Sequence, residues 1–132
     1  MCGAARLERW YEGRLSDILV VHNHRNRCQV RKFLEDLSRN DCQEREKMDR
    51  LLELIADHGP PRNEERYKHV TGQVWEVKTH KARILVCCFG RCIVLLEACI
   101  KRTQKLDPNV LGRAQELIGL LPSLLRTYLG RE

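Results

Sequence analysis

The stretch of residues 82–100, "ARILVCCFGRCIVLLEACI", decides the fold because it indicates a β-hairpin. Its apolar runs, Ala82–Phe89 and Cys92–Ile100, are rich in β-branched and other apolar residues, and Gly90-Arg91 separates them. Such runs on either side of a short turn are typical of paired antiparallel strands. Apolar and charged residues alternate in the preceding residues 74–79, which predicts a further strand and an antiparallel meander.

Helical spacing occurs on both sides of this meander. From Cys28 onward, apolar residues recur at i, i+3, i+4 and i+7 in two successive segments: Val30, Phe33, Leu34 and Leu37, then Met48, Leu51, Leu52 and Ile55. Each set forms one stripe of an amphipathic helix. Asp41 followed by Glu44 resembles a capping box for the second helix, and Gly59-Pro60-Pro61 ends it.

The rest of the chain completes a β-α-α-β-β-β-α order. Residues 18–22 predict a first strand, residues 6–11 a short helix or a frayed tail, and residues 61–72 a charged loop. A third helix with Val110, Ala114, Leu117 and Leu121 on one side is expected to stop at Pro122. We therefore expect one α+β domain over residues 1–132, with a core at about 18–121 and a tail at 122–132. Its helices would cover one face of a small antiparallel sheet and leave the other partly open.

The net charge of +6 and the pI near 9.1 favour an anionic partner. Residues 1–58 hold equal numbers of basic and acidic side chains, so the excess lies in residues 59–132. No apolar run approaches the ~20 residues of a membrane span. The N-terminal residues, with Arg6 early, do not resemble a secretory signal, so the seven cysteines are expected to remain thiols in the cytoplasm.

Alternation in the predicted sheet places several charged side chains on one face. If Trp75 and Val77 face the helices, Glu76 and Lys78 face the opposite side, and hairpin pairing brings Arg83 beside them. The set suits metal-independent RNA cleavage, in which a 2′-hydroxyl attacks its own phosphate. In that reaction, Glu76 or Lys78 would act as the base. Arg83 and Arg102 would stabilise the transition state, and Lys101 or Lys105 would bind the phosphate.

A plainer interpretation of the same residues remains open, because alternating Glu and Lys is also common on a solvated strand face. His80 and Lys81, in the predicted hairpin turn, are candidates for RNA contact or simply a solvated turn. Cys87, Cys88, Cys92 and Cys99 offer four thiols, but neighbours on a strand face opposite sides and the sequence contains no Cys-x-x-Cys pair. We expect no metal and no small-molecule cofactor.

The motif order "GQVWEVKTHKARILVCCFGRCIVLLEACIKRTQKLDP" resembles HigB-like toxins of the RelE superfamily, including their phage-derived group. The resemblance extends from about residue 28 to residue 119. Trp75-Glu76 matches the Trp-Glu pair of that family, Lys78 its basic strand residue and Arg83 its hairpin arginine. Lys101-Arg102 and Lys105 match its Lys-Lys-x-x-Lys motif.

This resemblance implies a RelE/ParE-like fold and a type II toxin that cleaves mRNA on the ribosome. It also implies a helix-turn-helix antitoxin as cognate partner and no membrane association. The chain departs from the family pattern at Glu97, Cys99, Asp107 and Val110, where the family often has His, an aromatic residue, Pro and Glu, respectively.

Two alternatives remain on the same scaffold. One is a non-catalytic phage-derived inhibitor that binds a host protein, which the departures and the apolar residues 124–129 favour. The other is a ParE-like gyrase poison. The sequence leaves the RNA sequence preference, the identity of the partner and the oligomeric state undetermined.

Overall fold

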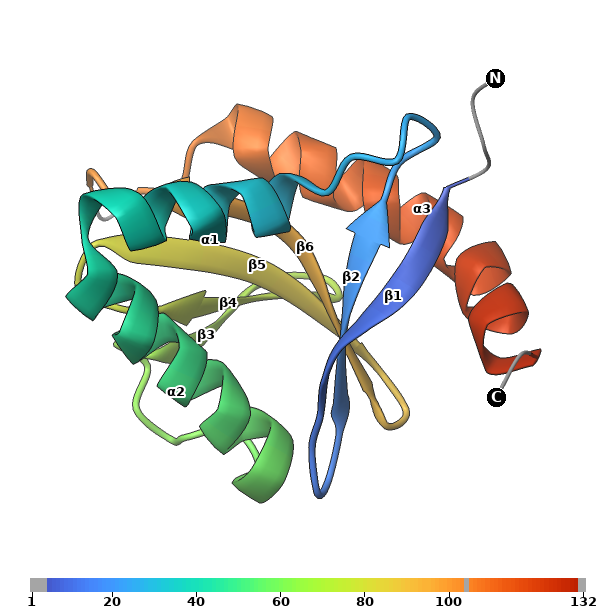
Figure 1. The fold of residues 1–132 in the computed structure, drawn as a ribbon, viewed down its shortest axis with the longest axis horizontal. Helices are drawn as coiled ribbons and strands as arrows, with labels where there is room; N and C mark the ends of the chain where they lie inside the picture. The colour runs from blue at the N-terminus through green and yellow to red at the C-terminus, as the bar shows by residue number, and fades with distance from the viewer. Residues whose placement is uncertain (1–4, 104, 131–132) are drawn as a thin grey trace.

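The computed structural model describes residues 5–103 and 105–130 and shows an α+β fold. Three helices pack around one six-stranded sheet (Figure 1). The elements in chain order are β1 (Arg6–Glu12), β2 (Asp17–His22), α1 (Gln29–Asn40), α2 (Cys42–His58), β3 (Tyr67–Thr71), β4 (Val74–Lys78), β5 (Ala82–Phe89), β6 (Cys92–Ile100) and α3 (Pro108–Gly130).

The strands follow the spatial order β1-β2-β6-β5-β4-β3. The predicted meander is confirmed, because β4, β5 and β6 pair antiparallel in succession. The sheet is not wholly antiparallel, since β2 lies parallel to β6. The connection between these parallel strands contains α1, α2, β3, β4 and β5, so the chain is long enough to cross over between them.

The hairpin of α1 and α2 covers one face of the sheet (Figure 1), as predicted. Its buried residues include those of the two predicted stripes, except that Phe33 is only partly buried, and α2 also buries Glu44 and Ala56. Asp41 caps α2 by accepting a hydrogen bond from the Glu44 amide at 3.2 Å. Gly59 ends α2 with a φ of 93°, a conformation that favours glycine.

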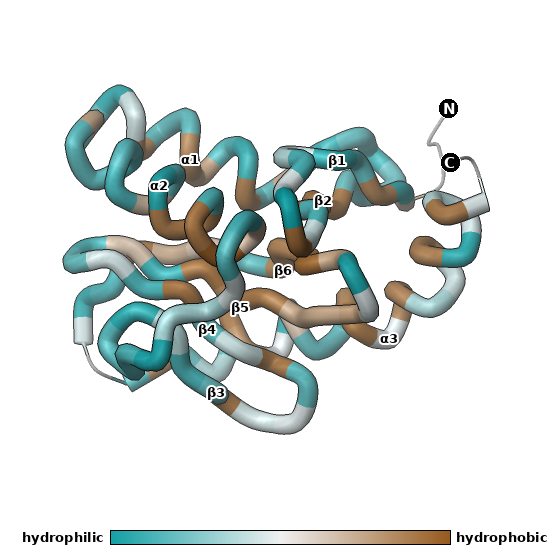
Figure 2. The backbone as a smooth tube through the Cα atoms, turned by 90° about the horizontal axis from the view of Figure 1, so that it is seen from below, coloured by the Kyte–Doolittle hydropathy of each residue, from teal (hydrophilic) through white to brown (hydrophobic). Residues whose placement is uncertain are grey.

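Helix α3 covers much of the other face, which the sequence predicted to be partly open. Its buried residues Val110, Ala114, Leu121 and Leu125 join Leu85, Val94 and others in a second apolar cluster. Strands β5 and β6 are therefore buried on both faces, and their continuous apolar runs follow from this position between two helical layers. Figure 2 shows the hydrophobic residues concentrated along these strands and on the helix sides that face them.

Two edge strands were missed in the sequence. Residues 6–11, predicted as a helix or a tail, belong to strand β1, and the predicted loop 61–72 contains strand β3. Both strands lie at an edge of the sheet, where one side has no neighbouring strand and many side chains are exposed. Their mixed polar sequences (Figure 2) therefore lack the apolar alternation that identifies an inner strand.

The prediction that Pro122 ends the last helix was wrong. Helix α3 continues through Pro122 to Gly130, so the predicted tail is largely helical, apart from residues 131 and 132, which lie outside the described residues. Leu121 and Leu125, on either side of the proline, are both buried against the sheet. This packing outweighs the cost of the missing amide hydrogen bond at Pro122. Among the described residues, no helix has the length and apolar character needed to cross a membrane.

Candidate functional site

Three of the predicted site residues form a buried ion cluster, defined here as Glu76, Lys78 and Arg83. The Arg83 Nε lies 2.9 Å from Glu76 Oε2, and the Lys78 Nζ lies 3.5 Å from Glu76 Oε1. Only 6%, 7% and 3% of Glu76, Lys78 and Arg83, respectively, is exposed. The sequence correctly placed these residues together on one face, but that face is covered where they lie.

The segment that follows β6 covers this cluster. Arg83 Nη2 donates a hydrogen bond to the carbonyl oxygen of Thr103 at 3.4 Å. Cys99 is the cross-strand partner of Arg83, and burial raises the pKa of its thiol. The Arg83 guanidinium therefore faces the protein's own backbone and a neutral thiol.

Glu97 lies on the same face of the sheet as the ion cluster, next to an irregularity in the strand pairing. The register between β5 and β6 shifts so that Leu85 pairs with Glu97 and Val86 with Leu95. Leu96 and Glu97 consequently both face α3. The Arg113 Nε of α3 lies 2.6 Å from Glu97 Oε1, so this buried carboxylate is held by a helix rather than by the ion cluster.

The remaining predicted cations lie at or near the surface. Arg102 and Lys105 are exposed on the segment between β6 and α3, and Lys101 is half-buried. Lys81 is exposed in the β4–β5 turn, where its Nζ lies 2.8 Å from Asp41 Oδ2. That hydrogen bond holds the pKa of the Asp41 carboxyl below its usual range.

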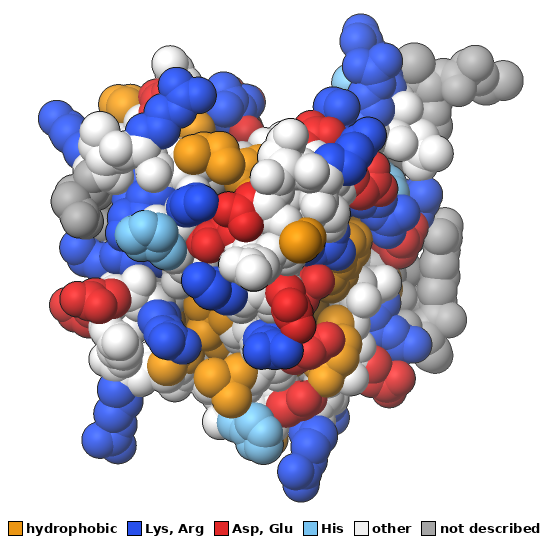
Figure 3. All heavy atoms as spheres, turned by 60° about the vertical axis from the view of Figure 1, so that its left-hand side comes forward, with side chains coloured by type: hydrophobic (Ala, Val, Ile, Leu, Met, Phe, Trp, Pro, Cys, Tyr) orange, Lys and Arg blue, Asp and Glu red, His pale blue; other side chains and the backbone are white. Residues whose placement is uncertain are grey.

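A cleft of about 780 Å³ lies between α2 and the end of β4. We call it the cationic cleft; its lining residues are Lys47, Arg50, Leu51, Leu54, Glu65, Arg66, Lys78, Thr79, His80 and Lys101. Besides Lys78, which is largely buried and paired with Glu76, four lysine or arginine residues and one histidine line the cleft together with a single carboxylate, Glu65. Figure 3 shows Lys, Arg and His side chains gathered on this side of the molecule, with Asp and Glu side chains among them.

The sequence had suggested Lys78, His80 and Lys101 as site residues, and all three line this cleft. It had not suggested Arg66 or the residues that α2 contributes to the cleft. A detectable signal was present, since Lys47, Arg50, Leu51 and Leu54 recur at helical spacing. That spacing places cations beside an exposed leucine on one side of α2, adjacent to the buried stripe.

The β4–β5 turn beside the cleft is fixed by a buried carboxylate from α2. Glu44 is only 2% exposed, and its Oε1 accepts a hydrogen bond from the Lys81 amide at 2.7 Å. Burial by itself would raise the pKa of Glu44, but hydrogen bonds from the Thr79 hydroxyl and the Lys81 amide outweigh it and keep the pKa below its usual value. The predicted capping box is thus half formed, because Glu44 binds this turn rather than the start of its own helix.

In residues 5–103 and 105–130, no group of three or more His, Cys, Asp or Glu side chains is placed to hold a metal ion. The described cysteines, which exclude Cys2, are free thiols. Cys87 is buried and Cys88 is exposed, as expected for neighbours on a strand.

The fold and the cleft define an α+β protein with a concave cationic site at one corner of its sheet. The family model "Phage derived protein Gp49-like (DUF891)" matches residues 33–118, and the chain belongs to this family. The family is related to toxin–antitoxin systems and is compatible with a toxin-like role. The matched segment extends from α1 into α3 and includes the buried ion cluster and the whole cationic cleft. No match was found among curated proteins.

Proposed function

We propose that this protein is the toxin of a type II toxin–antitoxin system and an endonuclease that cleaves mRNA on the ribosome. The observation that carries the proposal is the cationic cleft, which is lined by His80 and one carboxylate, Glu65, together with four cations outside the buried ion cluster: Lys47, Arg50, Arg66 and Lys101. Such an excess of cations in one concave site attracts a phosphate backbone. The resemblance to HigB-like toxins supports the same class of target, and the membership of the Gp49-like family is compatible with a toxin-like role.

The cleft residues suit cleavage by the RNA's own 2′-hydroxyl, a reaction that requires no metal. The arginines stabilise the dianionic phosphorane, because the planar guanidinium matches two phosphate oxygens. Arg50 and Arg66 stand on opposite walls of the cleft, one on α2 and the other immediately before β3. In this proposal they stabilise the transition state, a role that the sequence assigned to Arg83 and Arg102.

The apolar wall of the cleft supplies a surface for the bases. Leu54 of α2 lines the cleft and is 43% exposed, whereas Leu51, which also lines it, is buried. An unpaired base has an apolar face that packs against such side chains, so the cleft suits single-stranded RNA. A cytoplasmic helix-turn-helix antitoxin completes the proposal as the partner that restrains the toxin.

Expression in bacterial cells tests this function. The wild-type protein should arrest growth, and primer extension should reveal new 5′ ends within translated messages. The double variant Arg66→Ala/Lys101→Ala should relieve the arrest and leave the messages intact. Arg14→Ala/Arg91→Ala is the matched control, since both residues are exposed in turns away from the cleft, and it should remain toxic.

The burial of Lys78 and Arg83 favours a second candidate, a non-catalytic phage-derived inhibitor of a host protein. The residues that match the catalytic positions of HigB-like toxins are held in an internal ion cluster here. Growth arrest with intact mRNA and a stoichiometric host protein partner would support the inhibitor. Growth arrest with intact mRNA and DNA damage would instead indicate a gyrase poison.

A further inference from the structure

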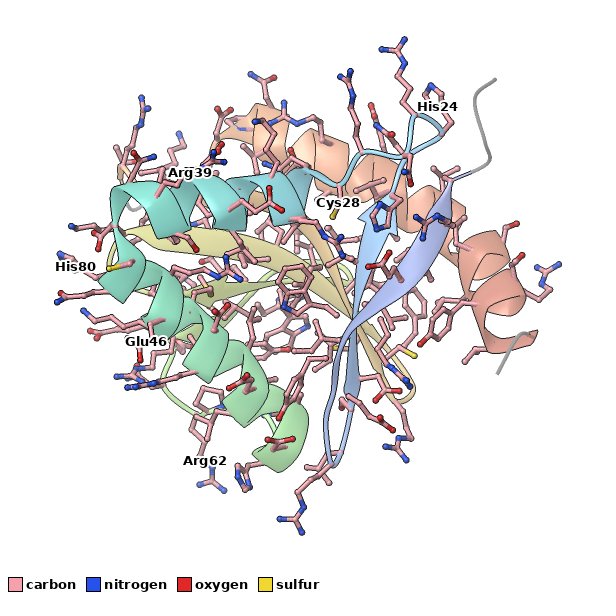
Figure 4. All side chains as sticks on the ribbon, in the orientation of Figure 1. His24, Cys28, Arg39, Glu46, Arg62 and His80 are labelled. Carbon is pink, nitrogen blue, oxygen red and sulfur yellow. The ribbon has the colours of Figure 1, made fainter. Side chains whose placement is uncertain are left out.

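His80 occupies a rigid position at the mouth of the cationic cleft. It is the middle residue of the β4–β5 turn, and Figure 4 shows it at the edge of the molecule beside the corner between α1 and α2. The residues on both sides of it, Thr79 and Lys81, donate hydrogen bonds to the buried carboxylate of Glu44. The backbone that carries this imidazole is therefore anchored to α2.

Lys101 is attached to the same turn. Its backbone amide donates a hydrogen bond to the Lys81 carbonyl oxygen at 2.8 Å, and its side chain lines the cleft together with His80. The imidazole and the ammonium group thus extend from two backbone segments that are directly hydrogen-bonded to each other. A proton-transfer pair requires such fixed relative placement.

We infer that His80 is the catalytic base of the proposed RNA cleavage, that Lys101 is its acid partner, and that Glu44 positions both through the β4–β5 turn. The inference rests on the proposed function and names the residues that carry its chemistry. Imidazole is the side chain that most often serves as a general base in enzymes, because its ring nitrogen accepts a proton and releases it again. Glu76 and Lys78, the bases suggested by the sequence, are buried and paired with each other.

The reaction balances with these groups alone. The neutral imidazole of His80 removes the proton of the 2′-hydroxyl, and the resulting oxygen forms a bond to the adjacent phosphorus. The bond from phosphorus to the 5′-oxygen breaks, and that oxygen takes a proton from the Lys101 ammonium. The products are a 2′,3′-cyclic phosphate and a 5′-hydroxyl, and proton exchange with water restores both residues.

The experiment measures single-turnover cleavage of ribosome-bound mRNA and identifies the end groups of the products. The wild-type rate should rise with pH and reach a plateau, because a general base acts only in its deprotonated form. His80→Ala should reduce the plateau rate roughly 100-fold or more and abolish this pH dependence. Added imidazole should restore part of the lost rate, which a structural role for His80 would not allow.

Variants of Glu44 test the positioning role. Glu44→Ala should reduce the plateau rate about tenfold while RNA affinity stays within about twofold, because the turn loses its anchor but the cations remain. Glu44→Gln, which keeps an acceptor for the Lys81 amide, should recover most of the rate. Glu53→Ala is the matched control, an exposed glutamate on the same helix, and it should behave as wild type. Thermal unfolding of each variant confirms that the compared proteins are folded.

The possible failures are distinguishable. If the wild-type protein leaves mRNA intact, the proposed function and the inference both fall. If the wild type cleaves mRNA and His80→Ala cleaves it at the same rate with the same pH profile, the inference alone is overturned. If Glu44→Gln loses as much rate as Glu44→Ala, the positioning role of Glu44 is overturned.

Discussion

The buried ion cluster and the cationic cleft contain side chains of the same types in different surroundings. In the cluster, Lys78 and Arg83 lie on either side of Glu76 beneath the segment that follows β6. In the cleft, Lys47 and Arg50 are exposed on α2, and the one carboxylate that Arg50 contacts, Glu46, is exposed as well. A buried charge needs its partner for stability, whereas an exposed cation is available to a ligand. The comparison assigns the cluster to the architecture and the cleft to function.

The largest expected effect concerns the cluster. Glu76→Ala leaves the Lys78 ammonium and the Arg83 guanidinium buried without the carboxylate between them. The free energy of unfolding, measured with urea, should fall by about 3–5 kcal/mol. Glu12→Ala is the control, because its carboxylate on β1 is exposed and lies 3.9 Å from Arg9, and it should change stability by less than about 1 kcal/mol.

A loss below about 1 kcal/mol for Glu76→Ala would contradict the comparison, because it would mean that solvent reaches the cluster. Lys78 and Arg83 would then be accessible to a phosphate, and the roles that the sequence assigned to them would regain support.

A smaller effect is expected in the cleft, on binding rather than stability. Lys47→Ala/Arg50→Ala should weaken binding of single-stranded RNA about tenfold and make its salt dependence shallower, since fewer phosphates are neutralised. The urea midpoint should stay unchanged, because the Arg50 pair with Glu46 is exposed. Fluorescence anisotropy at several salt concentrations measures the affinity.

Lys32→Ala/Arg39→Ala removes the same charge from exposed positions on α1 and is the matched control. An equal loss of RNA affinity in this control would mean that net charge, and not the cleft, determines binding.

The sequence predicted those features that depend on side-chain spacing. The helical stripes around Leu34 and Leu52 and the alternation around Val77 are local patterns, and the structure contains them. The placement of Arg83 beside Glu76 and Lys78 followed from strand pairing alone. These predictions needed no knowledge of what covers each face.

Predictions that depended on distant contacts failed. Burial of the ion cluster comes from the segment after β6, and the continuation of α3 through Pro122 comes from the packing of Leu125 on the sheet. The crossover between β2 and β6 is likewise set by long-range pairing. In the cleft, Lys47 and Arg50 look like an ordinary solvated helix surface until the fold brings them opposite Arg66.

His22 is a third case for the comparison, because it is a buried titratable side chain whose ion-pair partner, Glu8, is partly exposed. It is 5% exposed, and its Nε2 lies 3.0 Å from Glu8 Oε2. Burial lowers its pKa, with help from the positive charges of Arg6 and Arg31 and against the opposing effect of Glu8. The folded protein therefore binds fewer protons here than the unfolded chain, so stability should decrease as pH falls below about 6.5, the ordinary value for histidine.

This pH effect should be the smallest of the three, because Glu8 partly compensates for a charged imidazole. His22→Gln removes the titrating ring, so the loss of stability between pH 7 and pH 5.5, measured by urea unfolding, should be smaller than in the wild type. His24→Gln, which removes an exposed imidazole from the loop after β2, should leave the wild-type slope unchanged. If the stability of His22→Gln falls with pH as steeply as that of the wild type, the acid sensitivity originates elsewhere. The two variants are expected to differ because burial, rather than the mere presence of an imidazole, makes His22 unfavourable to protonate.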